Sequence, residues 1–225
     1  MKWETVVRLK FDLKLEEGTR IGGSGGGLEI GELVDSNLTA IRNPANDEFY
    51  IPGSSLKGKL RSVLERELGR TSNNGREPCD CGKVDCMICT VFGAHKKTQP
   101  ECGVTRIVVR DAFMSAASRE EFRKVGAAGK PIVEHKTENV INRSSGAAEH
   151  PRTGERLLPG TVFDGEILLH VYEKDDAKKM TGFVRHGLGI IQEASSLGAG
   201  GSRGSGKVSF VNVREEIVPL EKLTV

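Results

Sequence analysis

Apolar and polar residues alternate one by one in several stretches of this chain, the pattern of a strand with one buried face. The clearest stretch is 7–15, where apolar side chains alternate with charged ones. Similar patterns predict strands at 104–111, 161–173 and 207–213. The residues that follow, around Pro219, are expected to form an edge strand or a tail.

Two stretches carry apolar residues at helical spacing. The first has a stripe that starts at Leu56 and repeats at i+4, i+7 and i+8, and it is expected to end at Gly69 as a C-cap. Ser54 or Ser55 is expected to accept hydrogen bonds from the free amides of its first turn. The second helix is predicted at 177–197.

The order of these elements is β-α-β, an insertion, and β-α-β. This order predicts an α+β fold with a ferredoxin-like or RRM-like core, in which two helices cover one face of an antiparallel sheet and the other face is left for RNA. We expect a single domain over 1–225 with insertions at about 70–102 and 113–158. The second insertion is expected to hold a short polar helix near 118–125 and an ordered but irregular, thumb-like arm.

The overall charge says little about partners. The chain has 33 Lys and Arg against 31 Asp and Glu, a net charge of +2, so a nucleic-acid site would need local segregation of charge. Residues 51–61 show such segregation, with three cations and no acid. There is no continuous apolar run of the length of a signal peptide core or a membrane span, so we expect a cytoplasmic protein without membrane contact.

The start of the first helix could bind phosphate. Ser54 and Ser55 lie beside the free backbone amides of a helix N-terminus, and Lys57 and Arg61 follow one turn apart on one face. The alternative is an ordinary amphipathic helix with a solvated basic face.

A second candidate is the glycine-rich stretch 198–207. Gly201 and the pair Gly206-Lys207 have the spacing of a P-loop, but Val208 stands where a hydroxyl residue is required, and the stretch leads from a helix into a strand instead of the reverse. The remaining interpretation is a loop of exposed amides that grips a nucleic-acid backbone with Arg203 and Lys207. A plain flexible connection is the alternative.

Four cysteines in eleven residues predict a structural zinc site. The spacing Cys79-x-Cys81-x4-Cys86-x2-Cys89 supplies the four thiolates of a closed tetrahedral site, which leaves no open position for a substrate. Free or paired thiols are the alternative. His95 and Cys102 are reserve ligands.

Candidate catalytic groups are harder to find from the residues alone. A lone aspartate in a loop, such as Asp35, is usually a solvated turn residue. His135, Lys136 and Glu138 could act as acids or bases but have no partner at a diagnostic spacing.

Seven motifs are spread over nearly the whole chain: Thr19-Arg20-Ile21-Gly22-Gly23, Val34-Asp35-Ser36, residues 51–61, residues 137–143, Pro151-Arg152, Glu155-Arg156 and residues 200–206. Together they resemble those of a known family, the repeated backbone subunits of type III-A (Csm) CRISPR effector complexes, within the RAMP superfamily.

The resemblance implies a subunit that binds guide RNA and cuts complementary target RNA at regular intervals. Its partners would be guide and target RNA, further copies of itself in a head-to-tail filament, and other subunits of the complex. The catalytic residue would be Asp35, with Mg²⁺ or Mn²⁺ as cofactor. The Zn²⁺ of the cysteine site is predicted from the cysteine spacing and not from the resemblance. The implied RNA-binding residues are Arg20, Gly22, Gly23, Ser54, Ser55, Lys57, Lys59, Arg61, Arg143, Arg152, Gly201, Arg203, Gly204 and Lys207.

Two other functions remain open. The chain could be a non-catalytic structural subunit that only binds RNA. It could also be a stand-alone endonuclease that processes precursor guide RNA, which would need a His or Tyr base and no metal.

Overall fold

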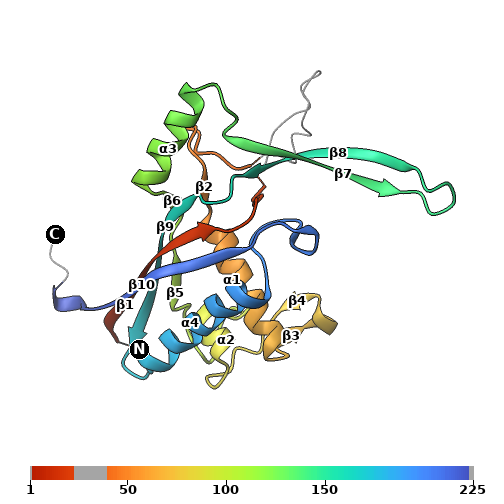
Figure 1. Ribbon diagram of the computed structural model, residues 1–225. Coiled ribbons are helices and arrows are strands. Elements are labelled where there is room, and N and C mark those ends of the chain that lie inside the picture. Colours follow the sequence, from red (N-terminus) through yellow and green to blue (C-terminus); the bar gives the residue numbers. More distant parts are fainter. Residues whose placement is uncertain (1, 23–39, 223–225) are drawn as a thin grey trace.

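The computed structural model describes residues 2–22 and 40–222 (Figure 1). The helices are α1 (Gly53–Glu67), α2 (Met87–Phe92), α3 (Ala116–Ala127) and α4 (Ala177–Ala194). The strands are β1 (Trp3–Leu15), β2 (Tyr50–Ile51), β3 (Thr71–Ser72), β4 (Glu77–Pro78), β5 (Ile107–Val109), β6 (Ala112–Met114), β7 (Val133–Ile141), β8 (Ala148–Leu157), β9 (Val162–Tyr172) and β10 (Val208–Pro219). None of the helices within these ranges is both long and apolar enough to cross a membrane.

The chain is a mixed α/β protein built on antiparallel sheets. Its main sheet has the strand order β10-β1-β9-β6-β2, and β5 pairs with a second part of β9. The alternation in β1 buries one face of the strand, as predicted: the apolar residues from Val7 to Leu15 are at most 3% exposed. The predicted strands at 161–173 and 207–213 are also confirmed, and β10 continues through the predicted edge-strand residues to Pro219.

Helices α1 and α4 pack together on one face of this sheet (Figure 1). Gly187 of α4 lets the two helices approach closely, since a β-carbon there would lie 2.6 Å from a methyl group of Leu60 and 2.8 Å from one of Leu64. Both leucines are fully buried, and each contributes about 2 kcal/mol through removal of apolar surface from water. The predicted helical stripes therefore build the core.

The sequence predicts the C-terminal end of α1 correctly but not the cap at its N-terminus. The C-cap residue is Leu68, and Gly69, with φ +61°, lies one position beyond it. The N–H of Arg70 donates to the carbonyl of Glu65 at 2.8 Å, so the predicted helix end at the glycine is confirmed to within one residue. The predicted serine cap is wrong, because neither serine makes a side-chain cap at the N-terminus of the helix. Instead, Asp111 Oδ1 accepts a hydrogen bond from the N–H of Gly53 at 2.7 Å.

The predicted strand at 104–111 is much shorter in the structure. Only Ile107–Val109 pairs with β9. On one side, Arg106 turns into a buried ion pair with Asp175, with Nε 3.0 Å from Oδ2 and Nη2 3.1 Å from Oδ1. On the other side, Asp111 caps α1. Backbone hydrogen bonds to β9 extend one residue further on each side, from the His170 N–H to the Arg106 carbonyl at 2.8 Å and from the Arg110 N–H to the Glu166 carbonyl at 3.1 Å.

The prediction of an irregular arm at 113–158 is also wrong. The polar helix near 118–125 is confirmed as α3, but the residues after it form a two-stranded antiparallel hairpin of β7 and β8 that projects from the body (Figure 1). We call this hairpin the arm. Most of its residues are exposed on both faces, so it lacks the apolar alternation that identifies a half-buried strand.

The cap of α1 gives a direct test of this arrangement. Asp111→Ala should lower the free energy of unfolding by about 1 kcal/mol, because the first-turn amide of Gly53 loses its acceptor. Asp111→Asn should recover part of this loss, since an amide oxygen can also cap. Urea unfolding measures both. Ser54→Ala and Ser55→Ala are the controls and should change stability by less than about 0.5 kcal/mol; a larger effect from the serines than from Asp111 would contradict the structure.

Candidate nucleic-acid interface and metal centre

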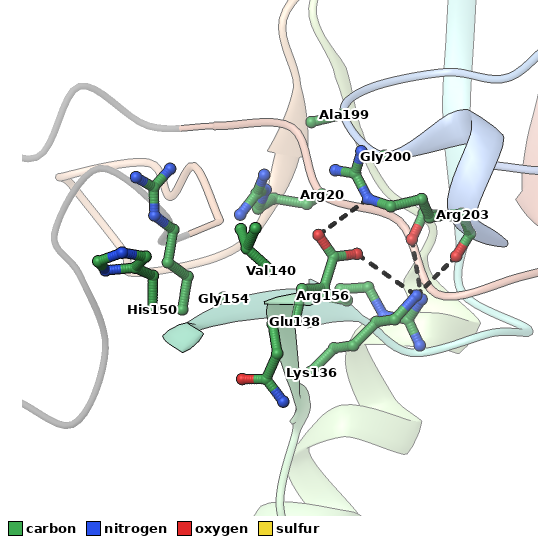
Figure 2. Close-up of a pocket in the computed structure, with 13 residues that line it drawn as sticks. Arg20, Lys136, Glu138, Val140, His150, Gly154, Arg156, Ala199, Gly200 and Arg203 are labelled. Carbon is green, nitrogen blue, oxygen red and sulfur yellow. Dashed lines mark hydrogen bonds and ion pairs between the residues drawn. The ribbon is translucent and has the colours of Figure 1, made fainter. Parts of the chain in front are cut away.

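A polar cleft of about 390 Å³ lies where three segments meet: the residues after β1, the base of the arm, and the loop between α4 and β10 (Figure 2). We call that loop, residues 198–206, the glycine loop. The Lys and Arg residues that line the cleft are Arg20, Lys136, Arg152, Arg156 and Arg203. Among the described lining residues the only carboxylate is Glu138. The cleft is therefore strongly cationic although the whole chain is nearly neutral.

The backbone around Arg20 is held from two sides. The preceding residue, Thr19, exchanges two hydrogen bonds with Leu157 of the arm, at 3.2 and 2.8 Å. Arg20 itself accepts a hydrogen bond from the N–H of Ala199 in the glycine loop at 2.9 Å. This approach requires a glycine at 198, where φ is +83° and a β-carbon would lie 2.2 Å from the Arg20 carbonyl oxygen.

Arg156 joins the arm to the glycine loop. Its guanidinium donates two hydrogen bonds to the carboxylate of Glu134, at 2.6 and 2.7 Å. The same group donates to the carbonyl of Gly204 at 3.0 Å and to Ser205 Oγ at 2.8 Å. With its side chain only 13% exposed, Arg156 acts mainly as a structural cross-link.

A second cross-link is more exposed. Nε of Arg203 donates to Glu138 at 2.9 Å, and Lys136 donates to the carbonyl of Arg203 at 2.6 Å while lying 3.6 Å from Glu138 (Figure 2). The hydrogen bond from Arg203, together with the nearby Lys136, lowers the pKa of Glu138 below its ordinary value. Glu138 is therefore ionised at neutral pH and balances part of the positive charge in the cleft.

The structure brings some of the predicted RNA-binding residues together. Arg20, Arg152 and Arg203 line the cleft from three different segments. Arg143 lies apart from them, in the turn at the tip of the arm, and Lys207 is exposed just before β10. Gly201 and Gly204 belong to the glycine loop, which turns through a short 3₁₀ segment at Gly201–Arg203.

Asp35 and Gly23 lie outside the described residues. The residues on either side of the segment 23–39 are described, and they lie together: Gly22 pairs with Ala40 in a β-bridge. The N–H of Ala40 also donates to Glu155 of the arm at 3.2 Å. The described residues that flank this segment, Gly22 and Ala40, thus lie close to Arg20 and to the arm.

The predicted residues of α1 do not line this cleft within the described part of the chain. Arg61 is only 15% exposed, and it donates to Glu65 at 2.7 Å and to the carbonyl of Cys79 at 2.8 Å. Burial lowers the pKa of Lys57 and Lys59, with a smaller contribution from neighbouring arginines.

The four predicted cysteine ligands do converge. Sγ of Cys79 lies 3.7 Å from that of Cys81, 3.9 Å from that of Cys86 and 3.7 Å from that of Cys89. All four sulfurs lie within 4.8 Å of one another. Tetrahedral zinc with Zn–S bonds of about 2.3 Å needs sulfurs about 3.8 Å apart, so the donor set and its spacing fit this metal.

The cysteine loop is attached to α1 by a small buried network. Glu65 accepts the hydrogen bond from Arg61 and another from the N–H of Cys79, at 2.9 Å. The N–H of Gly82 points at Sγ of Cys89, 3.4 Å away, as is common around thiolate ligands. The reserve ligands Cys102 and His95 are not in the four-sulfur group.

Sequence reasoning missed three residues of the cleft. Glu138 and Lys136 were considered only as acids or bases, and Arg156 only as part of a motif. Glu134, Lys136 and Glu138 are spaced by two residues and therefore lie on one face of β7, the face that contacts the glycine loop. This two-residue spacing is visible in the sequence, but it identifies one face of a strand only once the arm is known to be a hairpin.

Comparison with known proteins places the chain among proteins of CRISPR systems. It is 39% identical over 98% of its length to the "CRISPR system Cms endoribonuclease Csm3" of Methanothermobacter thermautotrophicus, covering 90% of that protein. Proteins of the same name from Methanocaldococcus jannaschii and Streptococcus thermophilus are 35% and 33% identical, over 96% and 95% of this chain and 82% and 92% of theirs.

Solved structures show the same fold. A chain of the Csm3-Csm4 subcomplex of the type III-A CRISPR-Cas interference complex matches with a TM-score of 0.63 and 26% identity, over 98% of this chain and 83% of that one. A chain of the type III-B Cmr-beta complex bound to cognate target RNA has a TM-score of 0.61 at 17% identity, over 96% and 61% of the two chains. A family model described as "RAMP superfamily" matches residues 12–209. The chain therefore belongs to the RAMP superfamily.

Proposed function

We propose that this protein is a backbone subunit of a type III CRISPR ribonucleoprotein, which binds guide RNA and cleaves the complementary target RNA. The observation that carries the proposal is the cationic cleft, in which three separate segments present Arg20, Arg152 and Arg203 to one space. Its relatives of 33 to 39% identity are named endoribonucleases of CRISPR systems, and they are matched over nearly the whole chain.

The core is proposed to be ferredoxin-like, with the cysteine loop and the arm as insertions in one domain. The spatial order β10-β1-β9-β5, with α1 and α4 on one face, supports this assignment. Copies of the subunit would stack head to tail along the guide RNA, through a heterologous contact that repeats without closing. The solved relative from a type III-A complex is itself part of a subcomplex with another subunit.

The cleft is proposed to hold the RNA backbone, because arginine side chains bind phosphate through paired charged hydrogen bonds. The other proposed contacts are Gly22, Gly23, Ser54, Ser55, Lys57, Lys59, Arg61, Arg143, Gly201, Gly204 and Lys207. Those on α1 form a second, separate region, in which Arg61 would contribute its charge while it keeps its contacts to Glu65 and Cys79.

Replacing the two exposed arginines tests the cleft. The double variant Arg152→Gln and Arg203→Gln should weaken binding of single-stranded RNA about tenfold at moderate salt, and should lower the slope of log K against log salt by about 0.7 for each lost phosphate contact. Fluorescence anisotropy at several salt concentrations measures both quantities. Arg123→Gln, which removes the same charge from the exposed surface of α3, is the control and should leave both unchanged; equal losses from the control would contradict a localised site.

Asp35 is proposed as the catalytic residue. Its carboxylate would hold Mg²⁺ or Mn²⁺, which would supply stabilisation of the charge that develops on the phosphate. The RNA itself provides the nucleophile, since a 2′-hydroxyl can attack the adjacent phosphorus while the 5′-oxygen leaves. A single protein carboxylate can therefore be sufficient for the cleavage reaction.

The catalytic assignment predicts a separation of binding from cutting. In the assembled complex, Asp35→Ala should bind target RNA normally and cut it at least about a hundredfold more slowly, because metal stabilisation worth several kcal/mol is lost. Single-turnover cleavage of labelled RNA measures the rate, and Glu32→Ala in the same segment is the control. Full cutting by Asp35→Ala would contradict the assignment and favour a non-catalytic subunit, while cutting of precursor guide RNA in EDTA would favour the stand-alone processing enzyme.

The cysteine group is proposed to be a structural zinc knuckle. Four metal bonds would stabilise this short loop, and the network of Arg61 and Glu65 would connect it to α1.

Metal removal tests the knuckle. The purified protein should contain about one zinc per chain by elemental analysis, and Cys89→Ser should lose the metal and lower the melting temperature by about 10 °C. Cys102→Ala is the control, because Cys102 lies outside the four-sulfur group, and it should keep the zinc. A metal-free preparation as stable as the original protein would refute the proposal.

A further inference from the structure

Glu138 is the negative charge in the cationic cleft that the proposed function does not use. Its carboxylate lies at the centre of the view in Figure 2, between the side chains of Arg203 and Lys136. The distance from Arg203 Nε to the Glu138 oxygen is 2.9 Å, which is the distance at which an arginine binds a phosphate oxygen. Glu138 thus provides Arg203 with the negative charge and the hydrogen-bond distance that a phosphate group would provide.

The contact is exposed enough to exchange. The side chain of Arg203 is 57% exposed and that of Glu138 is 36% exposed, so an incoming phosphate can reach the guanidinium. An ion pair of this kind is weak in water, because each partner is well solvated when they separate. The pair formed by Arg156 and Glu134 differs on the side of the arginine: Nη2 of Arg156 donates to both carboxylate oxygens, and the guanidinium is largely buried and also bound to the glycine loop.

We propose that Glu138 is an internal counter-ion that occupies the phosphate position of Arg203 in the free protein and is displaced when RNA binds. The inference rests on the proposed function, since it assumes that RNA enters this cleft. Exchange would also remove the carboxylate that lies 3.6 Å from Lys136, while the Lys136 ammonium keeps its hydrogen bond to the carbonyl of Arg203 at 2.6 Å. Arg156 keeps the arm attached to the glycine loop during the exchange, because its own partners are not disturbed.

A counter-ion of this kind has a consequence for specificity. Any ligand of Arg203 must compete with Glu138, so a single small anion binds weakly. A polyanion that also contacts Arg20 and Arg152 offsets the loss of the internal ion pair through these additional contacts. The cleft therefore discriminates in favour of a continuous sugar-phosphate backbone over isolated small anions.

The test is a double-mutant cycle on RNA binding by the full chain. Glu138→Gln should bind a single-stranded oligoribonucleotide about two- to fivefold more tightly than the original protein, which is the range expected when one exposed ion pair no longer competes. In a protein that already carries Arg203→Gln, the same change should have no effect, because there is no guanidinium left to release. Thermal melting checks that all variants remain folded, and both positions are exposed enough to tolerate glutamine.

Glu149→Gln is the matched control. Glu149 is an exposed carboxylate on the same arm that accepts a hydrogen bond from Asn142 Nδ2 at 2.8 Å, so its removal changes the net charge equally. An equal gain in affinity from Glu149→Gln, or a gain from Glu138→Gln that persists without Arg203, would show a general charge effect and overturn the proposal. Weaker binding by Glu138→Gln would overturn it too, since Glu138 would then position Arg203. Failure of every form, including the original protein, to bind RNA would instead contradict the RNA-binding function itself.

Discussion

The position of the arm depends on polar contacts at its base. Of the residues in β7 and β8, only Val133, Gly154 and Leu157 are buried, so apolar packing contributes little along most of the hairpin. Arg156 compensates by binding Glu134 within the arm and Gly204 in the glycine loop. Because a largely buried arginine is costly to leave without its acceptors, this cross-link fixes the arm, the loop and therefore the walls of the cleft.

The charged side chains of the protein have two different roles. The less exposed ones, such as Arg61 and Arg106, hold segments together through carboxylates and backbone carbonyls. The more exposed ones, such as Arg203 and Arg152, face the cleft. A net charge of +2 conceals this division, since the carboxylates that balance the total charge mostly lie outside the cleft.

Local patterns predicted the elements that bury one face. Strands β1 and β9 and helices α1 and α4 were found because burial against the core requires a period of two or of 3.6 residues, and that period is visible in the sequence. The arm was missed because a hairpin exposed on both faces has no such period. The cap of α1 was assigned to Ser54 or Ser55 because they are the local candidates, whereas the actual acceptor, Asp111, is 58 residues away from Gly53 in the chain.

The sequence by itself determined the core, the four-cysteine group and the family, because each depends on residue types at short spacings. Only the tertiary structure decided which cations share a site. Arg20, Arg152 and Arg203 lie far apart in the chain and meet because the arm and the glycine loop are cross-linked over the residues that follow β1. Tertiary structure also decided that Arg61 binds the cysteine loop and that Glu138 lies on Arg203, since the partner of a charged side chain is set by folding and not by its neighbours in sequence.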